Sequence, residues 1–248
     1  MQKTYIRTAD NSDTVVLFIH GFLGSTEHFE RFVARVPESI SVYNVLLAGH
    51  GAGVSDFTRA SMEEWKSQIE NILSELADKY RKIYIVGHSM GTFFALDGAV
   101  KYEYKVKCIY LMQSPLKIGV KPNALANTFK SFFKVFENNE KVREYKKAQG
   151  VKFSLRVWEW VGLIPRYLEL FGESKRARST FLKVKTPCLV FQSKKDELVS
   201  MKSVKYIPSA DNIKVNVLEK SEHFIYDREE TEYLEKTFSD MISGKFDK

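Results

Sequence analysis

A serine flanked by glycines lies where a strand-like run meets a helix-like run, and this junction restricts the fold more than any other feature. Residues 82–86 form an apolar run, and residues 92–104 have helical character. Between them stands Gly87-His88-Ser89-Met90-Gly91, a Gly-x-Ser-x-Gly motif. A tight turn from strand to helix holds a serine oxygen clear of the backbone, and the helix N-terminus favours developing negative charge. Ser89 is therefore the leading candidate nucleophile.

Strand-like and helix-like runs alternate along most of the chain. The strand-like runs are residues 15–19, 41–47, 82–86, 106–112, 188–192 and 214–218, and helical periodicity covers residues 27–36, 92–104, 200–207 and 228–242. A further helix is predicted to begin near Ser61, because Ser61 and Glu64 form a capping-box pattern ahead of a helical apolar periodicity. The alternation predicts an α/β fold on a mostly parallel sheet.

The alternation breaks between Pro115 and Pro187, where no clear strand is predicted. Bulky apolar residues follow helical spacing there: Phe129, Phe132, Phe133 and Phe136, then Trp158, Trp160, Leu163, Tyr167, Leu168 and Phe171. Such residues either pack in a core or line a pocket. Because the segment lies on the side where open α/β sheets bind ligands, we predict a helical lid over residues 116–185. The 248 residues suit one core, formed by residues 1–115 and 186–248.

The net charge of +7 is concentrated in the same segment. Residues 116–185 hold 16 basic and 6 acidic side chains, against 22 and 25 in the remainder. Such a stretch is either a solvated helical face or a surface that attracts anionic substrates or membrane headgroups. No nucleic-acid-binding module is recognisable, so no nucleic-acid partner is expected. The sequence leaves the oligomeric state open.

Neither export, a membrane span nor a metal site is indicated. The first residues lack an apolar signal segment, and no stretch approaches the ~20 apolar residues of a membrane span, so a cytoplasmic location is expected. Cys108 and Cys188 lie within apolar runs, where cysteine serves as a small buried residue. With no Cys-x-x-Cys pair or close His/Cys set, no metal site is expected.

A serine nucleophile needs a base to accept its proton and an acid to orient that base. Asp196 and His223 each follow a strand-like run closely. Because parallel strands end at the same sheet edge, both are expected beside Ser89, in the chain order Ser, Asp, His. Two other acids compete with Asp196: Glu197 is the next residue in the same loop, whereas Asp211 precedes its strand, at the opposite edge.

The other histidines are weaker candidates for the base. His88 adjoins Ser89 on the turn, so its side chain is expected to point away from the serine and to be structural. The remaining three are His20, His28 and His50.

The developing oxyanion needs at least two preorganised donors. The backbone N–H of Met90, next after Ser89, is one candidate. The second is the N–H of Phe22, in the loop His20-Gly21-Phe22-Leu23-Gly24-Ser25 that follows the first strand-like run. A phosphate cradle is the alternative for this loop, but the Lys-Ser/Thr pair of a P-loop and the Gly-x-Gly-x-x-Gly of a dinucleotide site are both missing.

Five segments together resemble the α/β-hydrolase superfamily: His20-Gly21-Phe22-Leu23-Gly24, Gly49-His50-Gly51, Gly87-His88-Ser89-Met90-Gly91, the Asp196 loop and Ser221-Glu222-His223. The stretch from Gln192 to Val199 and the short lid are similar to bacterial carboxylesterases and to monoacylglycerol-lipase-like or serine-aminopeptidase-type hydrolases. The resemblance implies an eight-stranded, mostly parallel sheet flanked by helices, a Ser89-Asp196-His223 triad, no cofactor and hydrolysis through an acyl-enzyme.

The chain departs from the superfamily pattern in two places. Glu222 precedes His223 where many relatives carry glycine, and Leu47-Ala48 stand where many carry Asp and Arg. Neither change removes a triad member.

The resulting hypothesis is a serine esterase that cleaves small to medium apolar acyl esters through an acyl-enzyme on Ser89. Lipase, peptidase, thioesterase, carbon-carbon hydrolase and cofactor-free haloperoxidase activities remain open, because one triad serves them all. A binding member of the fold without activity is a further alternative.

Overall fold

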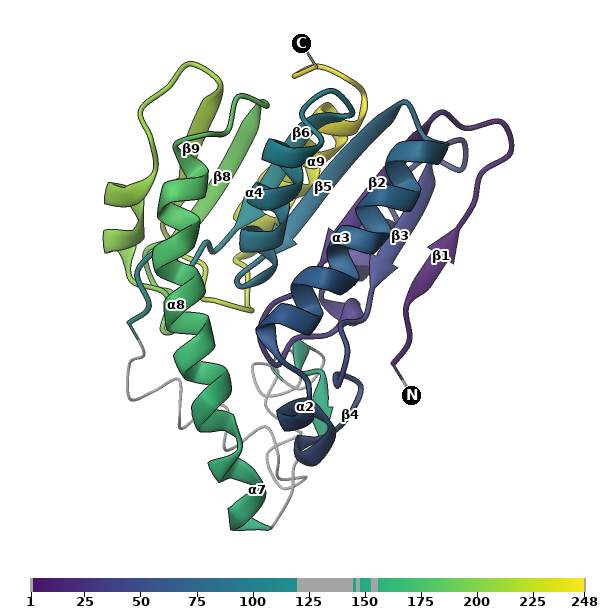
Figure 1. Ribbon diagram of the computed structural model, residues 1–248. Coiled ribbons are helices and arrows are strands. Elements are labelled where there is room, and N and C mark those ends of the chain that lie inside the picture. The colour runs from purple at the N-terminus through teal and green to yellow at the C-terminus, as the bar shows by residue number, and fades with distance from the viewer. Residues whose placement is uncertain (1, 120–144, 146–147, 153–155, 248) are drawn as a thin grey trace.

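A seven-stranded sheet with helices on both faces forms the centre of the computed structural model, which describes residues 2–119, 145, 148–152 and 156–247 (Figure 1). Its strands are β1 (Tyr5–Arg7), β2 (Thr14–Ile19), β3 (Ser41–Val45), β5 (Lys82–His88), β6 (Val106–Met112), β8 (Cys188–Ser193) and β9 (Ile213–Leu218). Their spatial order is β1-β3-β2-β5-β6-β8-β9. Only β1 pairs antiparallel within this sheet. The predicted α/β fold is confirmed, although the described strands number seven in this sheet rather than eight.

Alternate residues of each strand face two separate apolar layers. In β2, Val15, Leu17 and Ile19 belong to one layer, and Val16 and Phe18 belong to the other. Helices α3 (Met62–Lys79), α4 (Gly91–Lys101) and α8 (Leu163–Phe181) cover the first layer, whereas α1 (Glu30–Val33) and α9 (Arg228–Ile242) cover the second (Figure 1). Coverage of both faces explains why the central parallel strands are continuously apolar.

The helix predicted from Ser61 is confirmed. The Ser61 hydroxyl accepts a hydrogen bond from the Glu64 N–H at 3.1 Å, which satisfies one of the free donors in the first turn of α3. Trp65, Ile69 and Leu73 then recur on one face and are buried in the core.

Two other predicted helices are shorter or tighter than expected. The segment at 27–36 forms a 3-10 turn, η1 (Thr26–Phe29), followed by the single-turn α1, and the segment at 200–207 forms the 3-10 helix η3 (Met201–Tyr206). Pro37 and Pro208 follow these segments and lack the N–H that a continuing helix needs. The short β1 and α2 (Val54–Arg59) were not predicted.

The segment between Pro115 and Pro187 contributes α7 (Val157–Val161) and α8, as the helical spacing predicted. It also holds β7 (Val151–Lys152), which pairs in parallel with β4 (Ala52–Gly53). A two-residue strand is too short to create a periodicity, so the sequence did not reveal it. Phe129, Phe132, Phe133 and Phe136 lie outside the described residues.

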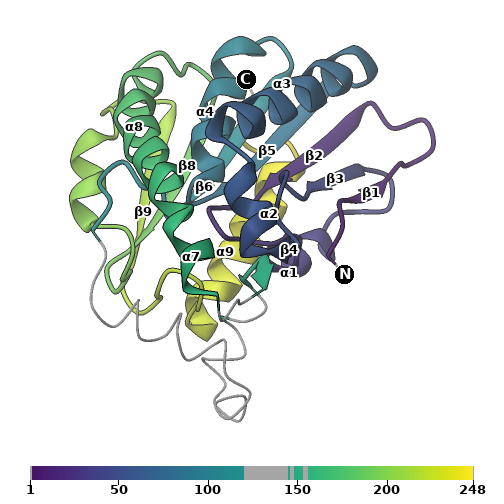
Figure 2. The ribbon, with the colours of Figure 1, turned by 60° about the horizontal axis from the view of Figure 1, so that its bottom comes forward.

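Helices α2 and α7 and the small β4–β7 sheet gather beyond the carboxyl ends of the central strands (Figures 1 and 2). Helix α7 contacts α2, and α8 runs from there along α3 and α4. Among the described helices, none is long and apolar enough to cross a membrane.

Candidate active site

The strand register brings the candidate catalytic residues to one sheet edge. β5 ends at His88, directly before Ser89, and Ile19 at the end of β2 lies opposite Gly87. β8 and β9 end opposite each other, and they lead into the loops that carry Asp196 and His223. The Ser89 turn and the loops that carry Asp196 and His223 therefore lie at the same edge of the sheet, although they are distant in sequence.

Ser89 has a strained backbone. Its φ of +52° lies in the left-handed region, which costs a residue other than glycine about 1–2 kcal/mol. Hydrogen bonds hold the turn in this conformation: the Ser89 N–H donates to the Met112 carbonyl at 2.9 Å, and the Ser89 carbonyl accepts from the Thr92 N–H and hydroxyl. Ser89 is partly accessible while its neighbours His88 and Met90 are buried. This is the geometry that the Gly-x-Ser-x-Gly motif predicts for an exposed nucleophile.

Two glycines allow the loop after β2 to approach Ser89. A Cβ at Gly21 would lie 2.7 Å from the Ser89 Cβ and 3.3 Å from its Oγ. A Cβ at Gly91 would collide with the carbonyl oxygens of Ile19 and His20. Any larger residue at either position would push the loop away from the serine.

The two predicted oxyanion donors flank this contact. Phe22 follows Gly21, and Met90 follows Ser89 at the start of α4. Within the part of the chain that the structure describes, neither backbone N–H donates a hydrogen bond to another protein group. Two such donors beside a serine oxygen suit the stabilisation of an oxyanion.

Asp196 and His223 form a buried pair. The Asp196 Oδ2 lies 2.7 Å from the His223 Nδ1, and both residues are 1% exposed. The Oδ1 of the same carboxylate accepts the N–H groups of Leu198 and Val199 at 2.8 and 2.7 Å. With both oxygens engaged, the carboxylate holds a proton on Nδ1 and leaves Nε2 as the basic nitrogen of the imidazole.

His88 connects the serine turn to the loop that carries His223. Its Nε2 lies 3.1 Å from the His223 carbonyl oxygen, and the two imidazole rings are 4.8 Å apart. The ring of His28 packs against His88 at 4.0 Å. His88 thus has a structural contact of the kind expected for it, although this contact reaches the neighbourhood of the base itself.

All five histidines of the chain are gathered near this edge, and burial keeps four of them neutral. Burial lowers the pKa of His20 to about 4 and that of His28 to about 3. The pKa values of His50 and His88 are also lowered well below the usual range, chiefly by burial. Their ring nitrogens are therefore neutral hydrogen-bonding groups near pH 7.

The competing acids take other positions. Glu197 is buried, and its Oε2 accepts the backbone N–H of His223 at 3.2 Å. Asp211 is exposed and precedes β9, at the opposite sheet edge. Of the three acids considered, Asp196 is the one that contacts the His223 ring.

The sequence did not single out Gln113, which supports the same loop region. Its backbone has a φ of +54°, and its Oε1 accepts the N–H of Ser193 at 2.9 Å, while its Nε2 donates to the Ser193 hydroxyl. The end of β8 is thereby tied to the end of β6, a few residues before Asp196. A lone glutamine after a strand carries no sequence signal for such a role.

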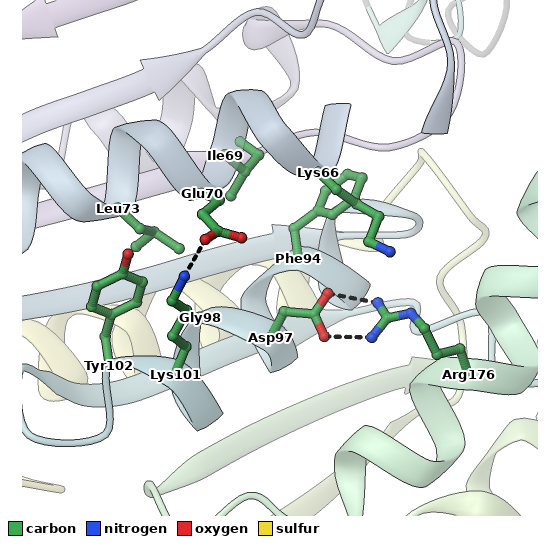
Figure 3. A pocket seen from close by; sticks show the side chains of 10 residues that line it. All are labelled: Lys66, Ile69, Glu70, Leu73, Phe94, Asp97, Gly98, Lys101, Tyr102 and Arg176. Carbon is green, nitrogen blue, oxygen red and sulfur yellow. Dashed lines mark hydrogen bonds and ion pairs between the residues drawn. The ribbon is translucent and has the colours of Figure 1, made fainter. Parts of the chain in front are cut away.

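A separate cavity of about 250 Å³ lies between α3, α4 and α8 (Figure 3). Four of its five charged side chains pair with one another, Lys101 with Glu70 and Arg176 with Asp97, whereas Lys66 pairs with Glu63 and Glu173 outside the lining. None of the predicted catalytic residues lines it. In the described residues, no group of three or more side chains suited to a metal ion occurs.

Comparisons with known proteins place the chain in a family and find partly similar relatives. A family model described as the alpha/beta hydrolase family matches residues 16–235. The probable lysophospholipase BODYGUARD 4 of Arabidopsis thaliana is 29% identical over 102 residues, which cover 40% of this chain and 24% of that protein. The thermostable monoacylglycerol lipase of Bacillus sp. (strain H-257) is 32% identical over 85 residues, 34% of either chain. The matched parts span about a quarter and a third of these two curated relatives.

A solved structure of a metagenome-derived lipolytic enzyme is similar over nearly the whole chain. It superposes with a TM-score of 0.73 at 17% identity, covering 97% of both chains. At this identity the likeness concerns the fold.

Proposed function

The chain belongs to the alpha/beta hydrolase family, and from that premise we propose that it is a serine esterase that acts through an acyl-enzyme on Ser89. One observation carries the proposal: the buried Asp196–His223 pair, 2.7 Å between Oδ2 and Nδ1, in a loop tied to the residue next to a strained serine. The partial likeness to a monoacylglycerol lipase supports an ester as the substrate. Small to medium apolar acyl esters are the proposed class.

In the proposed mechanism, the Nε2 of His223 takes the proton of Ser89 as its Oγ attacks the ester carbonyl carbon. The N–H groups of Phe22 and Met90 donate to the resulting oxyanion. Asp196 stabilises the imidazolium, which then gives its proton to the departing alcohol. A water molecule, deprotonated by His223, then attacks the acyl carbonyl carbon, and the imidazolium returns the proton to the departing Ser89 Oγ as the acid is released.

The test is hydrolysis of p-nitrophenyl esters from acetate to palmitate. We expect the wild type to turn over short or medium chains and Ser89→Ala to lose several orders of magnitude in kcat. Ser179→Ala, an exposed serine on α8, is the matched control and should retain wild-type activity. Mass spectrometry after treatment with a fluorophosphonate should find one adduct, on Ser89.

Failure to hydrolyse any ester would overturn the esterase proposal. Thioester, peptide and carbon-carbon substrates, which the same residues can serve, would then be assayed with the same variants. An unlabelled Ser89 together with inactivity on all of these would favour a binding protein that has kept the fold.

We propose in addition that residues 116–185 act as a lid over the acyl group. The support is a ring contact: Tyr167 of α8 lies 4.9 Å from Phe22, the predicted oxyanion residue, whose ring also packs on Phe57 at 5.0 Å. Replacing Tyr167 with alanine should then shift the preferred acyl chain length while leaving the labelling of Ser89 intact. An unchanged chain-length profile would contradict the lid.

The same segment is our candidate for contact with an anionic lipid surface. Five apolar side chains of α7 and α8 are strongly exposed: Trp158, Val161, Ile164, Leu168 and Phe171, at 46–71%. An exposed apolar row within a basic segment suits a membrane interface. Co-sedimentation with phosphatidylglycerol vesicles at low salt tests this, and Leu168→Glu should weaken the binding. Absence of wild-type binding at low salt would exclude it.

A cytoplasmic location is proposed as well. The support is that Cys108 and Cys188 are both free and buried. Fractionation of the source cells tests it, and recovery of the protein outside the cytoplasmic fraction would overturn it.

A further inference from the structure

A second buried carboxylate stands beside the proposed base. Glu197 is 1% exposed, and its Oε2 accepts the backbone N–H of His223 at 3.2 Å. Its Oε1 is also buried and has no hydrogen-bond partner among the described residues. The desolvation free energy of a buried carboxylate exceeds the stabilisation from one hydrogen bond, so that bond alone does not explain why Glu197 is buried.

Glu197 and Asp196 approach His223 at different points. Asp196 contacts the imidazole at Nδ1 and uses its other oxygen on two backbone N–H groups. Glu197 contacts the main chain of the same residue. Consecutive residues of one loop thus supply two carboxylates to one histidine, the first at the ring and the second at the backbone.

The groups around this pair include few opposing charges. His88 and His28 face the His223 side, and burial lowers the pKa of each well below its usual range, so they remain neutral near pH 7. Glu222 and the buried Tyr226 interact electrostatically with Glu197. Burial raises the pKa of Glu197, and the neighbouring His223 opposes that rise. A cation on His223 and the hydrogen bond from the His223 backbone N–H therefore both favour the ionised form of Glu197.

From this geometry we propose that Glu197 is a positioning residue of the hydrolase: it fixes the backbone of His223 and places a second negative charge beside the imidazolium that forms during catalysis. The inference rests on the proposed function, since it assigns a role within that site. A glutamine at position 197 separates this role from a purely structural one. Its side-chain oxygen can still accept the His223 N–H, but it carries no negative charge to stabilise the imidazolium.

The experiment compares Glu197→Gln with the wild type in the pH dependence of kcat/KM between pH 5 and 9. Loss of the charge should lower the apparent pKa of the acid limb by about one unit and the plateau of kcat by about tenfold, with KM little changed. Glu197→Asp keeps the charge and should leave the acid limb near its wild-type position.

The matched control is Glu219→Gln. Glu219 lies four residues before His223, is 60% exposed in its side chain and pairs with Lys194 at 2.7 Å. The Glu219→Gln substitution removes one negative charge, as Glu197→Gln does, but from the surface. Because solvent screens exposed charges, the acid limb of the kcat/KM profile of this variant should coincide with that of the wild type.

The outcomes separate the two proposals. A wild type that neither hydrolyses esters nor labels at Ser89 refutes the proposed function. If the wild type is active and the acid limb of Glu197→Gln coincides with that of the wild type, the role of Glu197 alone is refuted.

Near-ultraviolet circular dichroism shows whether each variant folds. If Glu197→Gln does not fold, the size-matched variants Glu197→Asp and Glu197→Asn answer the same question, and coincident acid limbs in these two would overturn the inference.

Discussion

The helices of the sheet core and the α7–α8 segment carry the same types of apolar residue at the same helical spacing. In the core helices these side chains are buried, whereas several in the α7–α8 segment are exposed. Trp65 and Phe93 lie on α3 and α4 and are fully buried against the sheet. Trp158 and Leu168 lie on α7 and α8 and are 71% and 66% exposed. Helical periodicity therefore identifies an apolar face, whereas the neighbouring element decides whether that face is covered.

The two regions also differ in how they attach to the molecule. The second half of α8 packs on the core through Ala177 and Phe181, which are both fully buried. Its first half, with α7, reaches past the sheet edge toward α2 (Figures 1 and 2). We expect substitutions in the core to affect stability and chemistry, and those in the exposed half to affect substrate preference.

The largest difference is expected in turnover. Asp196→Asn keeps the shape of the side chain but disturbs the tautomer of His223, and should lower kcat by about 10⁴-fold. Tyr167→Ala, in the α7–α8 segment, should lower kcat by less than about tenfold, because it alters substrate fit alone. Steady-state kinetics on the best p-nitrophenyl ester measures both. Comparable losses in the two variants would remove the distinction between the regions.

Stability should show the next largest contrast. Phe93→Ala removes a fully buried ring from the core and should lower the free energy of unfolding by about 3–5 kcal/mol. Phe171→Ala, on the 46% exposed ring of α8, should change it by less than about 1 kcal/mol. Chemical denaturation gives both values. A large loss for Phe171→Ala would mean that another part of the protein covers this face.

The pH dependence of stability should come from the core, because all five histidines lie outside residues 116–185. Burial lowers the pKa of His28 to about 3. Below about pH 6.5, His28 therefore binds a proton in the unfolded chain but stays neutral in the folded one. Stability is thus retained above that pH and lost as the pH falls. His28 alone should contribute about 2 kcal/mol of loss between pH 7 and 5.

Denaturation of the wild type and of His28→Gln at pH 7 and 5 measures this contribution. The glutamine variant should lose about 2 kcal/mol less than the wild type over that interval. Equal losses in both proteins would show that His28 is protonated in the folded state.

Much of the candidate site could be predicted from the sequence, because its signals are local. The order of strand, Ser89 and helix, and the positions of Asp196 and His223 after strands, depend on short motifs and on the rule that parallel strands end together. Two predicted helices are shorter or tighter in the structure, where Pro37 and Pro208 follow them.

Contacts between distant segments left no sequence signal. The hydrogen bond from His88 to the His223 carbonyl joins residues 135 positions apart, and no motif records it. The role proposed for Glu197 depends on which of two adjacent carboxylates turns toward the His223 ring and which toward its backbone, and side-chain geometry alone decides that. The exposure of Trp158 likewise depends on what lies beyond the sheet edge.

The smallest expected effect concerns the ion pairs that attach α8 to the core. Arg176 donates two hydrogen bonds to the Asp97 carboxylate, at 2.7 and 2.6 Å (Figure 3). It donates a third to Glu173 at 2.6 Å. Both partners of the Arg176–Asp97 pair are about one-third exposed, so solvent screens the attraction. A double-mutant cycle with Arg176→Gln and Asp97→Asn should give a coupling of about 1 kcal/mol, falling at high salt.

The control for this cycle is Arg228→Gln with Glu232→Gln, a pair on α9 whose side chains are 92% and 66% exposed, where coupling should be near zero. If the Arg176–Asp97 coupling is equally small, this ion pair does not help to hold α8, which then stays attached through its buried residues and its other hydrogen bonds, such as those that Ser174 and Arg178 donate to the carbonyls of Pro115 and Leu116. If the coupling reaches about 1 kcal/mol and the chain-length preference also shifts in Arg176→Gln, the ion pair sets the position of Tyr167 over Phe22, and the attached half of α8 directs what its exposed half does.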